Sequence, residues 1–135
     1  MKDIIKLLHE GNYSCVIKNG EEIRTFSNRG VKDLYLLLLD DSEFLKEAFI
    51  ADKVVGKAAA SLMILGGINE LYTDLISRPA LQILKGHNIK ISFQREVPVI
   101  LNRDRSDWCP LELVCFRENS LEKILKNISD FINSK

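Results

Sequence analysis

The chain has 135 residues, of which 46% are hydrophobic and 28% are charged, a balance typical of a globular protein and not of a disordered one. Its 19 Lys and Arg residues equal its 19 Asp and Glu residues, so the formal net charge is zero. A protein that binds nucleic acid normally carries a basic excess, and the even balance argues against that class of partner. The length predicts one domain that spans residues 1–135.

The cysteines and the N-terminal residues predict the cellular compartment. Cys15, Cys109 and Cys115 are an odd number of cysteines without short paired spacings, which favours free thiols in a reducing cytoplasm. The first residues mix charged and apolar side chains, and so lack the continuous apolar segment of a signal peptide. The longest apolar stretch, residues 58–65, is too short to span a membrane. We therefore expect a soluble cytoplasmic protein with no membrane partner.

The first elements in chain order are a short helix and a hairpin. Residues 2–10 place their apolar side chains on one side of a helix. Residues 13–26 form two alternating runs around Asn19 and Gly20. An Asn-Gly pair readily adopts positive φ at both central positions of a two-residue turn, so these runs predict a β-hairpin.

Three helices are predicted next. The first covers residues 31–41, and the second covers residues 42–49, with Ser42 as a plausible cap. The third covers residues 52–67 and is rich in alanine and apolar on almost all sides, as a buried helix would be. We expect Asp52 to cap its first turn and Gly66 to supply a left-handed C-terminal stop.

The second half of the chain alternates short strands and helices. Strands are predicted at residues 68–77, 88–94 and 97–103, and helices at residues 79–86 and 120–132. Pro98 would place the last strand at or near a sheet edge. Residues 109–116 are compatible with either a helix or a strand. The order predicts an α/β fold, a three-layer α/β/α sandwich whose mixed sheet opens with an antiparallel hairpin.

Four short segments resemble one protein family, in the order in which they occur. They are "DKVVGKAAA" (52–60), "ISRPAL" (76–81), "ILNR" (100–103) and "CPLE" (109–112). Together with the order of the elements, they make the chain similar to the cytidine deaminase-like fold, and more narrowly to a small family of bacterial proteins with that fold. The resemblance covers nearly the whole chain and implies a single cytidine deaminase-like domain.

The resemblance also implies that the zinc site of the deaminases is missing. Working deaminases carry a His-x-Glu motif at the start of one buried helix and a Pro-Cys-x-x-Cys motif at the start of the next. The resemblance places Val55 at the histidine and Lys57 at the glutamate, and it places Cys109 and Glu112 at the two cysteines. A tetrahedral zinc site needs three or four convergent ligands, which this set does not supply. We therefore expect no metal, no other cofactor and no zinc-dependent deamination.

Cys109 is a candidate nucleophile or redox-active thiol. If a helix begins at Pro110, the sulfur of Cys109 faces unpaired backbone amides, which together with the helix dipole would stabilise a thiolate. Glu112 would reach back to the amide of Cys109 as in a capping box, and Lys57 would face the same pocket if the resemblance holds. The alternative is an inert, half-buried Cys109 with Glu112 merely as a cap.

Lys57 and Gly56 raise a second question about this pocket. Lys57 interrupts an otherwise apolar helix, and a buried lysine must find an anion or lose its proton. Glu112 is one candidate partner, and a phosphate or carboxylate of a ligand is another. The alternative is that the lysine extends to the surface. Gly56 predicts a close approach to the backbone, by a neighbouring element or by a ligand.

Further candidate ligand residues lie at strand ends, the usual ligand-bearing edge of an α/β sheet. Asn102 and Arg103 end a predicted strand, and Arg103 could hold a phosphate or carboxylate through two hydrogen bonds or pair with a nearby aspartate. Ser77 could offer its hydroxyl to a ligand or cap the next helix. Trp108 could stack on a flat ligand or fill the core.

Three functions from different classes remain open. The one we favour is a module that binds an anionic, nucleotide-like molecule in the former deaminase pocket without turning it over. Its ligand-binding residues would be Asp52, Lys53, Gly56, Ser77, Asn102, Arg103 and Trp108. The second is an enzyme with Cys109 as nucleophile, Lys57 beside it and Glu112 as acid or base, catalysing acyl, sulfur or glycosyl transfer, although no histidine is near to act as base. The third is a subunit interface, such as that of a homodimer, at an exposed sheet edge.

Overall fold

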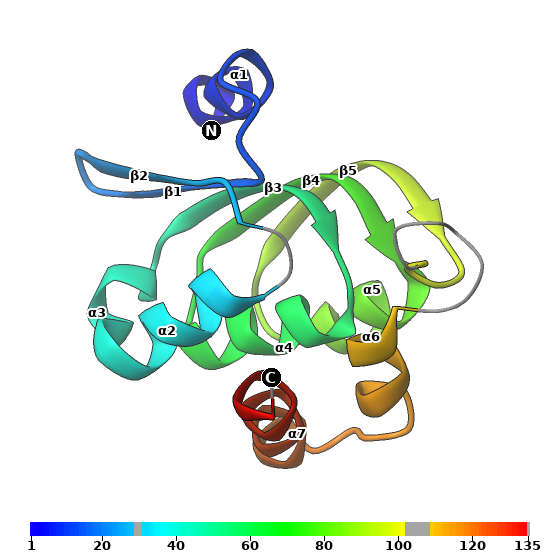
Figure 1. Cartoon of the computed structure of the whole chain (residues 1–135). Coiled ribbons are helices and arrows are strands. Elements are labelled where there is room, and N and C mark those ends of the chain that lie inside the picture. Colours follow the sequence, from blue (N-terminus) through cyan, green and yellow to red (C-terminus); the bar gives the residue numbers. More distant parts are fainter. Residues whose placement is uncertain (29–30, 102–108, 135) are drawn as a thin grey trace.

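The computed structural model describes residues 1–28, 31–101 and 109–134 (Figure 1). Five strands form one sheet in the order β2-β1-β3-β4-β5. The strands are β1 (Cys15–Asn19), β2 (Glu22–Phe26), β3 (Phe49–Val55), β4 (Glu70–Ser77) and β5 (Lys90–Val97). The helices are α1 (Lys2–Glu10), α2 (Lys32–Asp40), α3 (Ser42–Leu45), α4 (Lys57–Gly66), α5 (Arg78–Leu84), α6 (Pro110–Cys115) and α7 (Leu121–Asn133). The architecture is therefore α/β.

The sheet is mixed, as the sequence predicts. β1 pairs antiparallel with β2 and β3, whereas β3, β4 and β5 run parallel to one another. The hairpin is confirmed, but its turn lies one residue later than expected, because Asn19 still pairs with Glu22. Gly20 occupies the first loop position with a φ of 61°, the positive value that a two-residue hairpin turn needs there.

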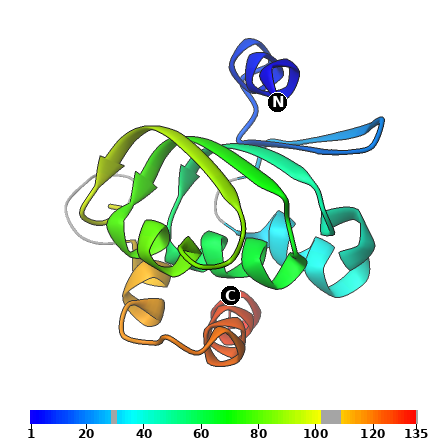
Figure 2. The ribbon, with the colours of Figure 1, turned by 180° about the vertical axis from the view of Figure 1, so that it is seen from behind.

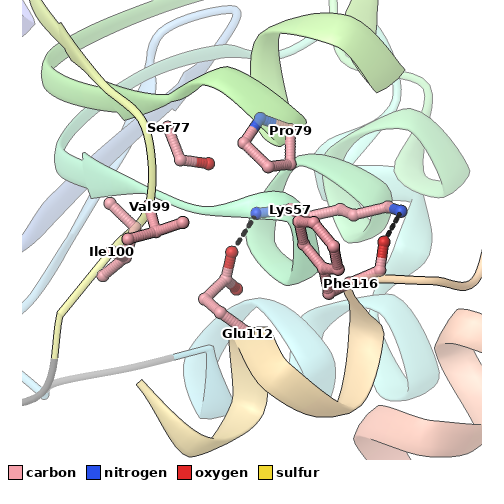
Figure 3. Close-up of a pocket in the computed structure, with 7 residues that line it drawn as sticks. All are labelled: Lys57, Ser77, Pro79, Val99, Ile100, Glu112 and Phe116. Atoms are coloured by element: carbon pink, nitrogen blue, oxygen red, sulfur yellow. Dashed lines mark hydrogen bonds between the residues drawn. The ribbon is translucent and has the colours of Figure 1, made fainter. Parts of the chain in front are cut away.

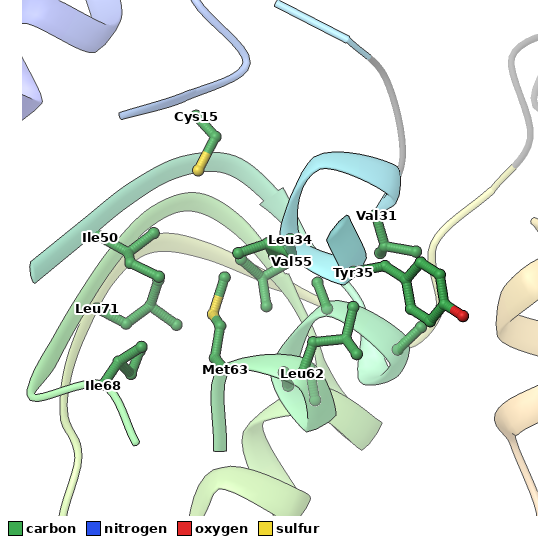
Figure 4. Close-up of a cluster of buried hydrophobic side chains, with 14 of the residues drawn as sticks. Cys15, Val31, Leu34, Tyr35, Ile50, Val55, Leu62, Met63, Ile68 and Leu71 are labelled. Carbon is green, nitrogen blue, oxygen red and sulfur yellow. The ribbon is translucent and has the colours of Figure 1, made fainter. Parts of the chain in front are cut away.

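Helices cover the two faces of the sheet unequally (Figures 1 and 2). α2, α4 and α5 line one face, and α7 packs on the outer side of α4. On the other face, α1 packs against β1 and β3. The first face holds the main apolar cluster, which includes Ile50, Val55, Leu62, Met63 and Leu71 (Figure 4). The second cluster, under α1, consists of Ile4, Leu8, Val16, Ala51 and Tyr72.

The prediction of one helix over residues 52–67 is wrong in its first part. Residues 52–55 belong to β3, and Asp52 lies opposite Cys15 in the antiparallel ladder instead of capping a helix. β3 is the central strand, and its residues Ile50 and Ala51 are buried against opposite clusters. The misassigned residues include the charged Asp52 and Lys53, and Asp52 in this position resembles a helix cap.

Two cap residues and one strand also differ from the predictions. The left-handed residue after α4 is Gly67, with a φ of 75°, and not Gly66. The residue that precedes α3 is Asp41, so Ser42 is the first helical residue. Beyond Val97, the described part of the predicted strand 97–103 is irregular apart from a single bridge residue. The helix predicted over residues 42–49 ends at Leu45, and Phe49 belongs to β3. The remaining predicted helices and strands are confirmed, and residues 109–116, which the sequence leaves open, contain α6.

Candidate functional site

The candidate site lies at the C-terminal ends of the parallel strands β3 and β4 (Figure 3). α4 begins shortly after β3 ends, and α5 begins directly after β4. α6, which comes much later in the sequence, packs against α4. Ligands of open α/β sheets usually bind at this edge.

The carboxylate of Glu112 on α6 accepts hydrogen bonds from the first backbone amides of α4. The Oε1 atom lies 2.6 Å from the amide nitrogen of Lys57, and Oε2 lies 3.2 Å from that of Ala58. The first amides of a helix have no partner within the helix, and the helix dipole favours an anion beside them. Glu112 therefore supplies, from within the protein, the anion that the start of α4 attracts.

Burial disfavours the charged form of Glu112, whereas its hydrogen bonds favour that form. Only 9% of the surface of Glu112 is exposed. This burial raises the pKa of Glu112, whereas the amides of Lys57 and Ala58 and the charge of Lys57 act in the opposite direction. Desolvation outweighs these donors, so the pKa of Glu112 stays above its ordinary value.

Gly56 makes room for this carboxylate. A Cβ atom added at position 56 would overlap the carboxyl group of Glu112. The backbone of Gly56 is extended, with φ −98° and ψ −177°, so the position requires glycine for space and not for a left-handed conformation. The predicted close approach at Gly56 is confirmed, and the neighbour is the side chain of Glu112.

The amine of Lys57 points away from Glu112, towards the end of α6 (Figure 3). It donates to the carbonyl oxygen of Phe116 at 2.9 Å and to the side-chain oxygen of Asn119 at 3.4 Å. Lys57 is 5% exposed, so the alternative of a side chain that extends to the surface is wrong. Burial lowers the pKa of Lys57, and the nearby Cys115 and Glu112 oppose that change.

Cys109 lies at the N-terminal cap position of α6, as the sequence predicts. Its backbone amide donates to the carbonyl of Ile100 at 2.9 Å, and among the described residues its side chain makes no capping hydrogen bond. The predicted capping box between Glu112 and Cys109 is therefore wrong, because Glu112 bonds the two amides of the longer helix α4 instead. The thiol is half-buried against the main apolar cluster.

A small cavity lies between β4, α4 and α6 (Figure 3). Its described lining consists of Lys57, Ser77, Pro79, Val99, Ile100, Glu112 and Phe116. Its volume is about 10 Å³, which is roughly the space that one water molecule needs. The cavity brings together three of the predicted site residues, Lys57, Ser77 and Glu112, while Cys109 is not part of this described lining.

Ser77 has a structural role at this cavity. Its Oγ atom accepts a hydrogen bond from the amide of Ala80 at 3.2 Å, so Ser77 caps α5. The capping alternative for Ser77 is confirmed, although the same residue lines the cavity. The polar partners Phe116 and Asn119 were not predicted, because a backbone carbonyl at the end of α6 has no signature in the sequence.

Two of the remaining predicted ligand residues, Asp52 and Lys53, lie elsewhere. Asp52 is half-buried beside Cys15, and burial raises the pKa of Asp52 to about 7. The amine of Lys53 donates to the side chain of Asn12 at 2.6 Å, next to α1. Neither residue belongs to the described lining of the cavity. Three further predicted residues, Asn102, Arg103 and Trp108, lie outside the described residues.

The described residues contain neither a metal-binding cluster nor a membrane-spanning helix. Within residues 1–28, 31–101 and 109–134, no group of three or more His, Cys, Asp and Glu side chains could hold a metal ion. In the same ranges, no helix combines the length and the apolar character needed to cross a membrane.

The comparison with known proteins identifies the family. The family model TM1506, described as a domain of unknown function (DUF1893), matches residues 3–132. The chain belongs to the DUF1893 family. A crystal structure of the DUF1893 family protein TM1506 from Thermotoga maritima is similar to it, with a TM-score of 0.87 and 23% sequence identity, over 96% of this chain and 87% of that chain. At this identity the likeness shows a shared fold alone. None of the curated proteins matches the chain.

Proposed function

We propose that the N-terminus of α4 in this DUF1893 chain is an anion-binding site, and that it binds an anionic, nucleotide-like small molecule in exchange with the carboxylate of Glu112. The observation that supports the proposal is the position of the Glu112 carboxylate. Two backbone amides, those of Lys57 and Ala58, hold a carboxylate at a position that Gly56 leaves open. Helix N-termini with a glycine at the close approach are common sites for phosphate and carboxylate groups.

The size of the cavity sets a condition for ligand entry. A volume of about 10 Å³ admits roughly one water molecule and no phosphate. A ligand anion therefore takes the two amides only when the side chain of Glu112 moves away. This exchange replaces one anion by another at the same donors, so the cost of breaking the Glu112 hydrogen bonds is largely recovered.

The neighbours of the site favour a ligand with a phosphate and an uncharged remainder. Lys57 lines the cavity, and its positive charge favours an anion at this position although its amine points towards Phe116. Pro79, Val99 and Ile100 supply apolar lining. A cytidine deaminase-like pocket, which the sequence motifs indicate, would lie at this edge of the sheet and suits a nucleotide-like molecule. The polar contacts that such a ligand would make outside its anionic group stay a prediction.

Thermal unfolding of the wild-type protein with matched pairs of ligands tests this function. Each pair consists of a nucleotide and its nucleoside, with inorganic phosphate as a further probe. We expect nucleotides to raise the free energy of unfolding, by about 2.7 kcal/mol at 100 times the dissociation constant, and nucleosides to have a much smaller effect. Equal effects of nucleotides and nucleosides, or no effect across the panel, would contradict the proposal. The Gly56→Ala variant, whose added methyl group intrudes on the anion position, is expected to lose the nucleotide response.

A further inference from the structure

β5 forms the edge of the sheet opposite to the hairpin (Figure 2). β4 pairs with its inner side, and in the part of the chain that the structure describes no strand pairs with its outer side. Six of its eight residues are exposed. A long exposed edge strand presents a row of backbone donors and acceptors to any other strand that fits it. The outer side of β5 is therefore an open edge of the described fold.

The side chains of β5 are complementary to a second copy of the same strand. When two copies are aligned antiparallel about a two-fold axis at Phe93, Lys90 of each copy lies opposite Glu96 of the other. The symmetry forms this pair of opposite charges twice, and Phe93 faces its own counterpart. Opposite charges and aromatic pairs at directly facing positions both stabilise antiparallel strands. We propose that a second copy of this chain pairs with β5 in this register and joins the two sheets into one.

Neighbouring registers lack this match. A shift by one residue in one direction places Lys90 opposite Arg95, which brings two positive charges together. A shift by one residue in the other direction leaves Lys90 and Glu96 opposite uncharged residues. A one-residue shift also moves every side chain to the other face of the sheet. The pattern of β5 therefore favours this register over its two neighbours.

The surroundings of β5 fit this interface. Phe93 is 39% exposed although Ile91, on the same face of the strand, packs against the main apolar cluster. A partner strand would extend that cluster over Phe93. Glu96 already accepts a hydrogen bond from Arg78 at 3.1 Å. A carboxylate accepts several donors, so Lys90 of the second copy can join this pair without displacing Arg78.

Sedimentation velocity at increasing protein concentration measures the proposed pairing. We expect a reversible monomer–dimer equilibrium in the wild-type protein. Lys90→Glu places Glu opposite Glu96 at two symmetric positions and is expected to raise the dissociation constant roughly tenfold or more. The double variant Lys90→Glu/Glu96→Lys restores opposite charges in reversed order and is expected to dimerise again. Lys85→Glu, at an exposed lysine outside β5, is the charge-matched control and is expected to behave as wild type.

A cysteine at the two-fold axis gives a second readout that does not depend on the charge variants. In the proposed register, Phe93→Cys brings two thiols directly opposite each other, within the distance range of a disulfide. Gln94→Cys places them on a diagonal of roughly 7–8 Å, which is too far. We expect mild oxidation to link the first variant into dimers and not the second. A wild-type protein that stays monomeric at every concentration, a Lys90→Glu variant that dimerises like wild type, or equal cross-linking of both cysteine variants would overturn the proposal.

Discussion

Gly56 and Glu112 are complementary in shape, although they lie far apart in the sequence. The carboxylate of Glu112 occupies the space that any side chain at position 56 would fill, and from there it reaches the amides of Lys57 and Ala58. This contact joins α6 to the start of α4 and defines the proposed anion position. The first predictions concern the residues that form it.

Gly56→Ala is expected to destabilise the protein by about 1–3 kcal/mol, because the new methyl group displaces Glu112 and weakens its buried hydrogen bonds. Urea unfolding measures the effect. The matched test is the same substitution in a Glu112→Ala background, where the carboxyl group is absent and the methyl group has room. There we expect Gly56→Ala to cost much less, with a coupling energy of about 1 kcal/mol or more. Additive effects of the two substitutions would contradict the contact.

Lys57→Met is expected to change local order more than global stability. The substitution removes the hydrogen bonds to Phe116 and Asn119, but it also removes the cost of burying a charged amine, so the two effects on the free energy of unfolding largely cancel. We expect a net change below about 1 kcal/mol, together with faster hydrogen exchange of the backbone amides at residues 116–120. Lys53→Met, at a lysine that bonds Asn12 next to α1, serves as control. If the exchange rates at residues 116–120 were unchanged in Lys57→Met, the hydrogen bonds from Lys57 would not be what orders this segment.

Asp52 is expected to make the protein less stable as the pH rises towards 8. Burial raises the pKa of Asp52 from 3.8 to about 7, so the folded protein holds this proton more tightly than the unfolded chain does. The resulting stabilisation is fully present below the unfolded pKa and is lost as the pH rises through about 7.

The variant Asp52→Asn keeps a neutral side chain at every pH. It is therefore expected to match the wild type only below about pH 4. Its advantage in free energy of unfolding grows as the pH rises to about 7, where it amounts to about 1–4 kcal/mol. Urea unfolding at several pH values measures the difference, with Asp40→Asn at an exposed position as control. A difference between Asp52→Asn and wild type that does not vary with pH would show that burial leaves this carboxyl group unperturbed.

The three cysteines are expected to differ strongly in reactivity. Burial raises the pKa of Cys15 and raises that of Cys115 to about 11, whereas Cys109 is the most exposed of the three. Because the thiolate is the reactive form, iodoacetamide should modify Cys109 first in the folded protein. Peptide mass spectrometry identifies the labelled residue, and Cys109→Ser should stay unlabelled over the same time. Equally fast labelling of Cys115 would contradict the described packing of α6.

Local sequence signals predicted the elements whose packing is simple. The Asn19–Gly20 pair predicted the hairpin because its turn chemistry does not depend on the rest of the fold. The C-terminal helix α7 was predicted because its apolar residues recur at helical spacing, and Ile124 and Ile128 among them are buried. β3 was missed because Asp52, in the middle of the strand, resembles the cap of the following helix. Its identity as a strand depends on pairing with β1 and β4, which are distant in the sequence.

The sequence predicted several residues of the candidate site, but not the contacts between them. Family resemblance, and not spacing, brought Lys57 and Glu112 together, since 55 positions separate them. The prediction paired the thiol of Cys109 with the amine of Lys57, whereas the structure pairs the carboxylate of Glu112 with the backbone amide of Lys57. Which atom of Lys57 meets Glu112 depends on the orientation of α6 on α4, and no local pattern in either segment encodes that orientation.

Anion rescue of Glu112→Ala tests the central claim most directly. This variant removes the internal carboxylate and leaves the amides of Lys57 and Ala58 beside an enlarged cavity. We expect acetate, formate or phosphate to restore stability by about 1 kcal/mol or more near ten times the dissociation constant. Wild type and Glu112→Gln, in which the side chain still fills the position, should gain much less at equal ionic strength. If these anions stabilise all three proteins equally, or none of them, the start of α4 is not an anion site.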